Sequence, residues 1–273
     1  MPVHDTAVPR DPSHIDTSKP HPARMYDWFL GGKDNYPVDE EMGRQLVALE
    51  PRLPVMARVN RAFMHRATRW LAGNGVRQFL DIGTGIPTEP NLHQVAQQVA
   101  PAARVVYCDN DPIVLAHAEA LLRSAPEGVT AYVQADVRDT DTILRRAGEF
   151  LDFDRPVALS LVALLHFIRD EDGAGDLVDR LVSALPSGSF LMLSHASADF
   201  TPDTAKEATE LYQSRDVALS LRTGEQITRF FDGLDLVDPG VVVVPQWHPE
   251  LGDPVPGQDD GPIPGYAAVG RKP

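Results

Sequence analysis

Short apolar runs alternate with longer amphipathic stretches over most of this chain. The short runs predict strands at residues 79–81, 104–109, 129–135, 156–162, 189–194, 241–244 and 265–270. Apolar residues at helical spacing predict helices at residues 23–30, 38–50, 54–72, 90–99, 112–125, 140–150, 170–185 and 202–214. Strands that alternate with helices are typical of βαβ units, so we predict an α/β fold built on a parallel sheet.

The pattern changes after the fifth predicted strand. A capping box at residues 223–226 opens one more helix, and four consecutive valines at 241–244 favour a strand. The loop at 245–264 is rich in proline, glycine and acidic residues, and it leads to the last predicted strand without a helix. We therefore expect residues 241–244 and 265–270 to form an antiparallel hairpin at one edge of the sheet.

The N-terminal region differs from the rest of the chain. Residues 1–22 are rich in proline and have no periodicity, so we expect a disordered arm. Its three histidines are too dispersed for a metal site, and we expect none. Residues 23–273 are expected to form a single domain, with a helical cap at 23–75 and the α/β core at 76–273.

Composition limits the classes of partner and compartment. The chain has 273 residues, 43% of them hydrophobic, and a net charge of -14. This charge disfavours nucleic acids and anionic membranes and favours small neutral or cationic ligands. Cys108 is the only cysteine, which excludes an intrachain disulfide and fits a reducing compartment. The sequence has no secretory leader and no long apolar segment, so we expect a cytoplasmic protein.

One stretch, Phe79–Thr88, has the features of a nucleotide cradle. An apolar run ends at Asp81 and is followed by Gly83 and Gly85. Glycine at these positions allows a tight turn and a close approach of the backbone to a ligand. The phosphate-binding pattern has a third glycine where this chain has Thr88. A tight turn without any ligand is the alternative.

Acidic residues end three successive predicted strands: Asp81, Asp109 and Asp136. Each could be a helix cap or a solvated residue at the sheet edge. Together, at the ligand-binding edge of a parallel sheet, they suit a nucleoside without a phosphate. Carboxylates can accept hydrogen bonds from ribose hydroxyls and from the adenine amino group. An acidic mouth would also attract a sulfonium cation.

These residues resemble the class I S-adenosylmethionine-dependent methyltransferases. The turn at residues 79–85, Asp109 and Asp136 match the first three motifs of that superfamily. More narrowly, Ala23–Asn35 together with Asp81–Thr88 is similar to an actinobacterial S-adenosyl methyltransferase family long catalogued as a domain of unknown function. The resemblance implies a Rossmann-like sheet of seven strands in the order 3-2-1-4-5-7-6, with the last strand antiparallel. Pro87 departs from the superfamily, in which many members have glycine there.

The resemblance also implies a binding site for S-adenosylmethionine. Gly83, Thr84 and Gly85 would pass beneath its methionine part, Asp109 would bind the ribose, and Asp81 belongs to the same site. Gly83 and Asp109 are further apart in sequence than the corresponding residues of dinucleotide-binding folds.

The adenine would be bound at the ends of the second and third strands. Asn110 would lie beside the ring, and Asp136 with Val137 would flank the amino group. The residues that would cover the cofactor or fix its carboxylate are Tyr26, Asp34, Asn35 and Arg61. Residues 31–37 could be a connector between helices, in which Asp34 or Asn35 caps the next helix, or equally a mobile lid.

His166 is the candidate general base. It follows the fourth strand, and it resembles the histidine base of small-molecule O-methyltransferases. Local packing is the alternative role. His195 and His248 are weaker candidates, and Trp28 and Trp247 could line a substrate pocket or simply pack in the core.

We therefore expect a methyltransferase that uses S-adenosylmethionine to methylate an oxygen of a small molecule. One alternative is a non-catalytic protein that binds S-adenosylmethionine or a nucleoside. The other is a nicotinamide-dependent oxidoreductase, which the missing third glycine and the terminal hairpin disfavour. The sequence does not identify the acceptor or the oligomeric state.

Overall fold

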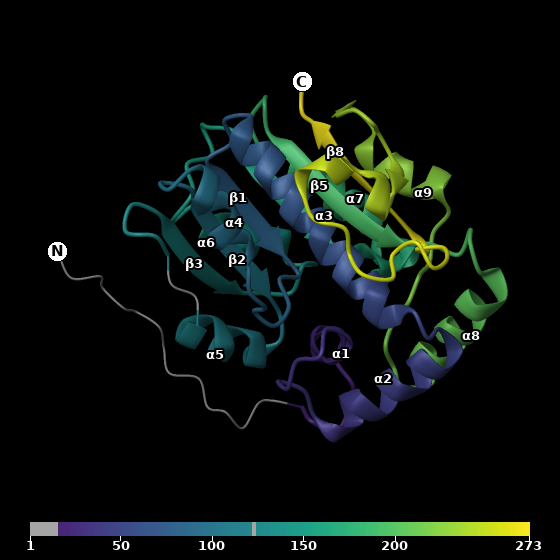
Figure 1. Cartoon of the computed structure of the whole chain (residues 1–273). Coiled ribbons are helices and arrows are strands. Elements are labelled where there is room, and N and C mark those ends of the chain that lie inside the picture. Colours follow the sequence, from purple (N-terminus) through teal and green to yellow (C-terminus); the bar gives the residue numbers. More distant parts are fainter. Residues whose placement is uncertain (1–15, 122–123) are drawn as a thin grey trace.

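In the computed structural model, which describes residues 16–121 and 124–273, one mixed sheet runs through the centre of the molecule (Figure 1). The strand order is β3-β2-β1-β4-β5-β8-β6, and β7 also pairs with β8. The strands are β1 (Gln78–Ile82), β2 (Arg104–Asp109), β3 (Val129–Gln134), β4 (Ala158–Val162), β5 (Phe190–Ala196), β6 (Asp235–Leu236), β7 (Val242–Val243) and β8 (Gly265–Arg271). The first five are parallel, and β8 is antiparallel to β5.

This sheet confirms the predicted fold class. The difference lies at the edge, where two short strands, β6 and β7, pair with β8 in place of one. The predicted strand at 241–244 is reduced to Val242–Val243 because a 3-10 turn begins at Val244. Pro245 is the cause, since it has no N–H to continue the ladder.

Helices cover both faces of the sheet. They are α1 (Pro22–Phe29), α2 (Pro37–Leu49), α3 (Leu53–Gly73), α4 (Leu92–Val99), α5 (Pro112–Leu121), α6 (Thr140–Ala147), α7 (Ala174–Ser183), α8 (Pro202–Gln213) and α9 (Gly224–Thr228). Side chains alternate along β1, so Phe79 packs in one core with α3 and α4, whereas Leu80 packs in a second core with α6 and α7. Figure 1 shows α3 lying across the first of these faces.

Two predicted helices begin later than expected. The helix predicted at 170–185 is divided at Gly173, whose φ of +81° ends a 3-10 turn before α7 begins. Pro90 precedes α4 and does not lie in its first turn. Asn91 caps that helix through a capping box with Gln94.

The N-terminal cap packs on a segment far away in the sequence. Met25 and Phe29 from α1 and Met42 and Leu46 from α2 share a buried cluster with Tyr212 of α8. Figure 1 likewise shows α2 beside α8, at the lower edge of the molecule.

Most of the predicted arm, residues 1–15, lies outside the described residues. Within residues 16–22, Lys19 Nζ lies 2.8 Å from the carboxylate of Asp216, and His21 caps α1.

The basic residues of α3 have a role that we did not predict. Arg66 is only 4% exposed. Its guanidinium donates to the carbonyl oxygens of Val244 and Trp247, at 2.9 and 2.8 Å. Arg69 similarly donates to Leu251. These hydrogen bonds fix the C-terminal loop on α3.

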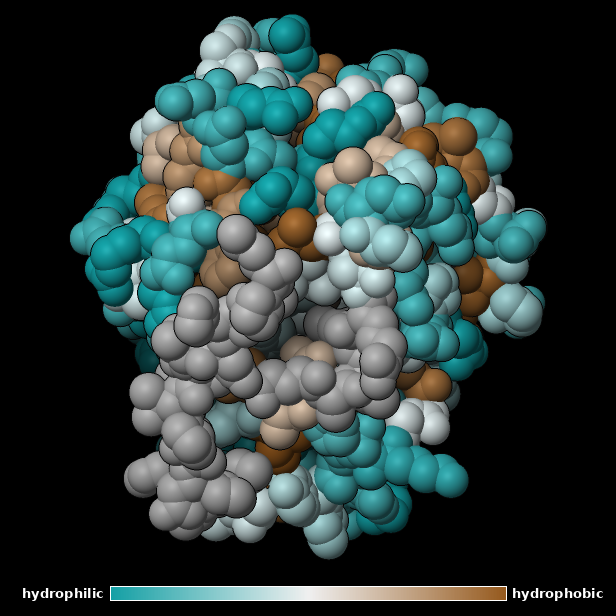
Figure 2. All heavy atoms as spheres, turned by 90° about the vertical axis from the view of Figure 1, so that its left-hand side faces the viewer, coloured by the Kyte–Doolittle hydropathy of each residue, from teal (hydrophilic) through white to brown (hydrophobic). Residues whose placement is uncertain are grey.

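The surface is predominantly hydrophilic on the face shown in Figure 2, where hydrophobic side chains form separate small patches. Among the described residues, the large hydrophobic side chains that are exposed are Val99 and Leu236. No helix within residues 16–121 and 124–273 combines the length and apolar character needed to cross a bilayer.

Candidate functional site

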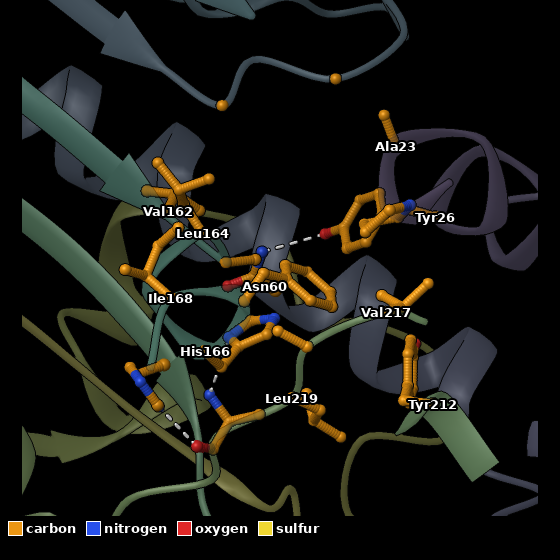
Figure 3. A pocket seen from close by; sticks show the side chains of 18 of the residues that line it. Ala23, Tyr26, Asn60, Val162, Leu164, His166, Ile168, Tyr212, Val217 and Leu219 are labelled. Atoms are coloured by element: carbon orange, nitrogen blue, oxygen red, sulfur yellow. Dashed lines mark hydrogen bonds between the residues drawn. The ribbon is translucent and has the colours of Figure 1, made fainter. Parts of the chain in front are cut away.

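A cavity of about 740 Å³ opens at the carboxyl ends of the parallel strands. Two groups of residues line it, and the space between them is continuous. The first is the glycine loop, residues 83–85, with the residues that follow β2 and β3. The second, which we call the apolar lobe, is lined mainly by Leu53, Met56, Phe167, Tyr212, Val217 and Leu219. Figure 3 shows Tyr212, Val217 and Leu219 on one side of this lobe, with Val162 and Leu164 across from them.

The glycine loop adopts a conformation that requires glycine. Gly83 and Gly85 have φ angles of +74° and +68°, in the left-handed region. A Cβ on Gly83 would lie 2.7 Å from the side chain of Leu164, so this glycine permits close packing. A Cβ on Gly85 would meet no protein atom within 4 Å. Gly85 therefore leaves a space open where a ligand can approach the backbone.

Asp109 shapes this loop. Its carboxylate accepts hydrogen bonds from the backbone N–H of Gly85 at 2.9 Å and of Asp111 at 3.0 Å. The side chain is buried, which raises its pKa, and it lines the cavity. Each carboxylate oxygen can accept a further hydrogen bond, so the predicted ribose contact is compatible with this structural role.

The predicted adenine-binding residues are brought together at the end of β3. Asn110 Nδ2 donates to Asp136 Oδ2 at 3.3 Å, and Val137 is buried beside them. Arg138, which we did not predict, donates from Nη1 to both oxygens of Asp136 at 3.1 Å. All four residues line the cavity. Arg138 gave no signal in the sequence beyond its position two residues after the acid.

Asp81 and Arg61 lie at the other end of the glycine loop. Burial raises the pKa of Asp81 to about 6, an effect that the nearby charge of Arg61 opposes. Arg61 donates from Nη2 to the carbonyl oxygens of Thr88 and Pro90. Its Nε and Nη1 groups make no hydrogen bond within the described residues. A carboxylate and a guanidinium with free donors fit the ammonium and carboxylate of a methionine moiety.

The structure separates the other proposed covering residues. Tyr26 lines the cavity, donates to the carbonyl oxygen of Ala57 at 2.9 Å, and accepts from Asn60. Asp34 and Asn35 do not belong to the cavity wall. The backbone N–H of Asp34 and the side chain of Asn35 both donate to Asp27, at 3.0 Å. They stabilise the connection between α1 and α2.

His166 lies at the junction between the two regions. His166 is 8% exposed, and its ring lies on the cavity wall (Figure 3). Nδ1 accepts a hydrogen bond from the backbone N–H of Ala196 at 3.4 Å. Burial, reinforced by the charge of Arg222, lowers the pKa of His166 to about 3. The imidazole is therefore neutral at physiological pH and is a weak base.

Arg222, which we did not predict, holds the loop that carries His166. It is 2% exposed and donates to the carbonyl oxygens of Leu165 and Ile168 and to the carboxylate of Asp170. Its Nη1 also lies 2.8 Å from His195 Nε2. Because His195 Nδ1 lies 2.6 Å from the carbonyl of Ala196, both nitrogens of His195 are occupied.

Three further residues considered in the sequence lie outside the cavity. Trp247 is fully buried and packs edge-on against Phe63. Trp28 packs against α2, where a Cβ on Gly43 would touch its ring. His248 lies between Glu250 and the carbonyl of Asp238. None of these three residues lines the cavity. Each has a structural role instead, in core packing or in holding the C-terminal loop. Among the described residues there is also no cluster of metal-binding side chains.

Comparison with known proteins identifies the family. Residues 9–273 match the model of the S-adenosyl methyltransferase family. A solved structure of a DUF574 family protein from Streptomyces avermitilis is 48% identical, with a TM-score of 0.91 over 95% of this chain and 100% of the other. A candidate methyltransferase from Thermobifida fusca is 39% identical, with a TM-score of 0.86 over 97% and 99%. No curated protein matches significantly. This chain belongs to the S-adenosyl methyltransferase family, whose cofactor is S-adenosylmethionine.

Proposed function

We propose that this protein transfers the methyl group of S-adenosylmethionine to an oxygen of a small molecule bound in the apolar lobe. One observation carries the proposal: the glycine loop and the apolar lobe belong to the same continuous cavity. A cofactor held along the loop and an acceptor held in the lobe can therefore meet without crossing solvent.

The residues around the loop fit the cofactor. S-Adenosylmethionine supplies an electrophilic methyl group on a sulfonium ion. Arg61 and Asp81 would hold the charged ends of the methionine moiety, and Asn110 and Asp136 would contact the adenine. Gly85 leaves the space that the chain of the ligand needs. Displacement at carbon depends on alignment and on exclusion of water, and a cavity with a mainly apolar lining favours both.

The apolar lobe has few acidic side chains that are free to bind a cationic amine. Acidic side chains at its outer edge are already paired. Asp172 Oδ2 lies 3.4 Å from Arg169 Nε, and Asp216 is paired with Lys19 at 2.8 Å. Glu50 also lines the cavity, near Leu53, and has no cationic partner among the described residues; its carboxylate accepts the backbone N–H of Arg52 at 3.0 Å. A wall that is mainly apolar offers little charge to hold an ammonium group, which is compatible with oxygen as the methylated atom.

The non-catalytic alternative has less support. A protein that only bound the cofactor would need no space beyond it, yet the lobe extends from the loop to α8, and His166 faces that space. Membership of the methyltransferase family weighs against the nicotinamide-dependent oxidoreductase.

The test is to incubate the protein with S-adenosylmethionine whose methyl carbon is labelled with ¹³C. The acceptors are apolar acids, phenols, alcohols, amines and thiols. Mass spectrometry detects each product, and the ¹³C chemical shift distinguishes methyl groups on oxygen, nitrogen and sulfur. We expect oxygen-bound methyl groups. Transfer to amines or thiols alone would refute oxygen methylation, and binding of the cofactor without any transfer would favour the non-catalytic alternative.

A further inference from the structure

A chain of hydrogen bonds fixes the orientation of the Asn60 amide. The backbone N–H of Ala163 donates to Ser194 Oγ at 3.0 Å, so the hydroxyl of Ser194 donates to Asn60 Oδ1 at 2.5 Å. On the other side, Tyr26 donates to the carbonyl of Ala57, and its oxygen accepts from Asn60 Nδ2 at 2.9 Å. The chain of hydrogen bonds starts at a backbone N–H, that of Ala163, and ends at a backbone carbonyl, that of Ala57. These two groups cannot exchange roles, so every hydrogen bond between them has a fixed direction. The second N–H of Asn60 has no acceptor among the described residues.

The protonated nitrogen of His166 follows from a similar argument. Nδ1 accepts from the N–H of Ala196, so the neutral ring has its proton on Nε2. No described residue accepts a hydrogen bond from Nε2. Asn60 is hydrogen-bonded to Ser194 and His166 to Ala196, two residues further along β5, and both side chains line the cavity (Figure 3). This part of the cavity wall therefore presents N–H donors.

We infer that the methyl acceptor is a carboxylic acid with an apolar body, and that Asn60 and His166 bind its carboxylate through their free N–H groups. This inference rests on the proposed function. A carboxylate accepts hydrogen bonds and has no proton to donate, so it satisfies both groups. A phenol or alcohol would also bring an O–H donor, and the free groups of Asn60 and His166 offer no acceptor for it.

The local charge supports an anionic acceptor despite the net charge of the chain. Arg222 is buried, and its positive charge acts on His166 strongly enough to contribute to the low pKa of that ring. The carboxylate of its partner, Asp170, is 69% exposed, so water screens it. The field at the junction therefore favours a negative group. The apolar lobe beyond it suits the rest of such a molecule.

Methylation of a carboxylate also requires no base. A lone pair on the carboxylate oxygen forms the new bond to the methyl carbon, and the bond from that carbon to sulfur breaks. The bonding electron pair stays on sulfur, which becomes a neutral thioether, and the product is a methyl ester. No proton moves in this step. A phenol or alcohol would have to lose a proton, and His166 is a poor acceptor for it because its pKa is about 3.

The experiment uses two ligands with the same apolar body, 2-naphthoic acid and 2-naphthalenemethanol. Their dissociation constants are measured by calorimetry on the full-length protein saturated with S-adenosylhomocysteine. His166→Phe removes the donor, whereas His166→Gln keeps an N–H in its place. His117→Gln, on α5 and outside the cavity wall, is the matched control. Melting temperature and affinity for S-adenosylhomocysteine verify that each variant is folded. Methyl transfer to the acid, the alcohol and 2-naphthol is assayed in parallel.

We expect the acid to bind the wild-type protein more tightly than the alcohol. His166→Phe should weaken binding of the acid by on the order of ten-fold, the effect of losing one hydrogen bond to a charged group. It should change binding of the alcohol little, and His166→Gln should restore most of the loss. Acid binding no tighter than alcohol binding, or equal losses for both ligands, would overturn the inference.

The transfer assay separates this inference from the proposed function. Formation of methyl naphthoate supports both. Methylation of 2-naphthol but not of the acid would overturn the carboxylate acceptor and leave oxygen methylation standing. Acid binding that depends on His166, without transfer to any acceptor, would support the inference and count against the proposed function.

Discussion

Arg24 Nε lies 2.9 Å from Asp111 Oδ2, in an ion pair that joins residues 87 positions apart. Both side chains are at least nine-tenths buried. Arg24 belongs to α1, whereas Asp111 follows β2 and donates its backbone N–H to Asp109. Because Asp109 also binds the N–H of Gly85, the pair connects the N-terminal cap with the glycine loop.

Arg24→Met should lower both stability and affinity for S-adenosylmethionine. The substitution leaves the carboxylate of Asp111 buried without its main partner, which typically costs about 3–5 kcal/mol. Urea denaturation measures the first effect and calorimetry the second. Lys19→Met is the matched control, since it removes an exposed ion pair of the same segment with Asp216. Similar results for the two variants would show that the buried pair has no special role.

Gly85→Ala should abolish most cofactor binding while the protein still folds. The new methyl group would extend into the space that the ligand needs, and it would meet no protein atom within 4 Å. We expect affinity to fall by on the order of ten-fold or more, equivalent to about 1.4 kcal/mol. Gly75→Ala controls for backbone strain, because Gly75 has a φ of +93°, equally free surroundings and a position outside the cavity. Equal affinity of the two variants would contradict this role of Gly85.

Binding of S-adenosylmethionine should weaken as the pH falls through about 6. Burial raises the pKa of Asp81 to about 6. Its carboxylate is therefore mostly ionised at pH 7 and becomes protonated as the pH falls through 6. Protonation removes the negative charge that would hold the ammonium group. Affinity should therefore be constant from pH 7 to 8 and fall by up to about ten-fold per unit well below pH 6. Calorimetry across this range measures it. Asp81→Asn should flatten the profile, and an unchanged slope in that variant would exclude Asp81 as the titrating group.

Arg222→Met should reduce stability and methyl transfer together. It leaves the carbonyl oxygens of Leu165 and Ile168 buried without a donor, at about 1–3 kcal/mol each. The loop that carries His166 would then be less ordered. Unfolding in urea and steady-state kinetics measure the two effects. Arg229→Met, which removes an exposed pair with Glu225, is the control. A fully active Arg222→Met protein would show that the loop holds its position by other means.

The parallel sheet and the gathering of three acids at its carboxyl edge were predictable from the sequence, whereas the strand order followed from the family resemblance. Strand periodicity, the glycine turn and the acids that end three strands are local signals. The topology of a parallel sheet brings such strand ends together. Asp81, Asp109 and Asp136 accordingly all line one cavity.

The apolar lobe was not predictable in the same way. Tyr212 and Leu219 reach the cavity only because α8 packs against the N-terminal cap, a contact between distant segments. Arg66 resembles the other arginines of α3 in sequence, yet it is buried because its acceptors lie about 180 residues further along the chain. Asn35 looked like a ligand contact, but it binds Asp27 nearby. Polar residues acquire their roles from long-range packing, which periodicity does not encode.

The most direct test of the proposed function is a crystal structure of the protein with S-adenosylhomocysteine. We predict that the adenine lies beside Asn110 and Asp136 and that the amino-acid end lies between Arg61 and Asp81. The sulfur should face the apolar lobe near His166, so that a methyl group on it would point toward an acceptor there. A sulfur atom that faces away from the lobe, or a ligand bound outside the glycine loop, would contradict the account.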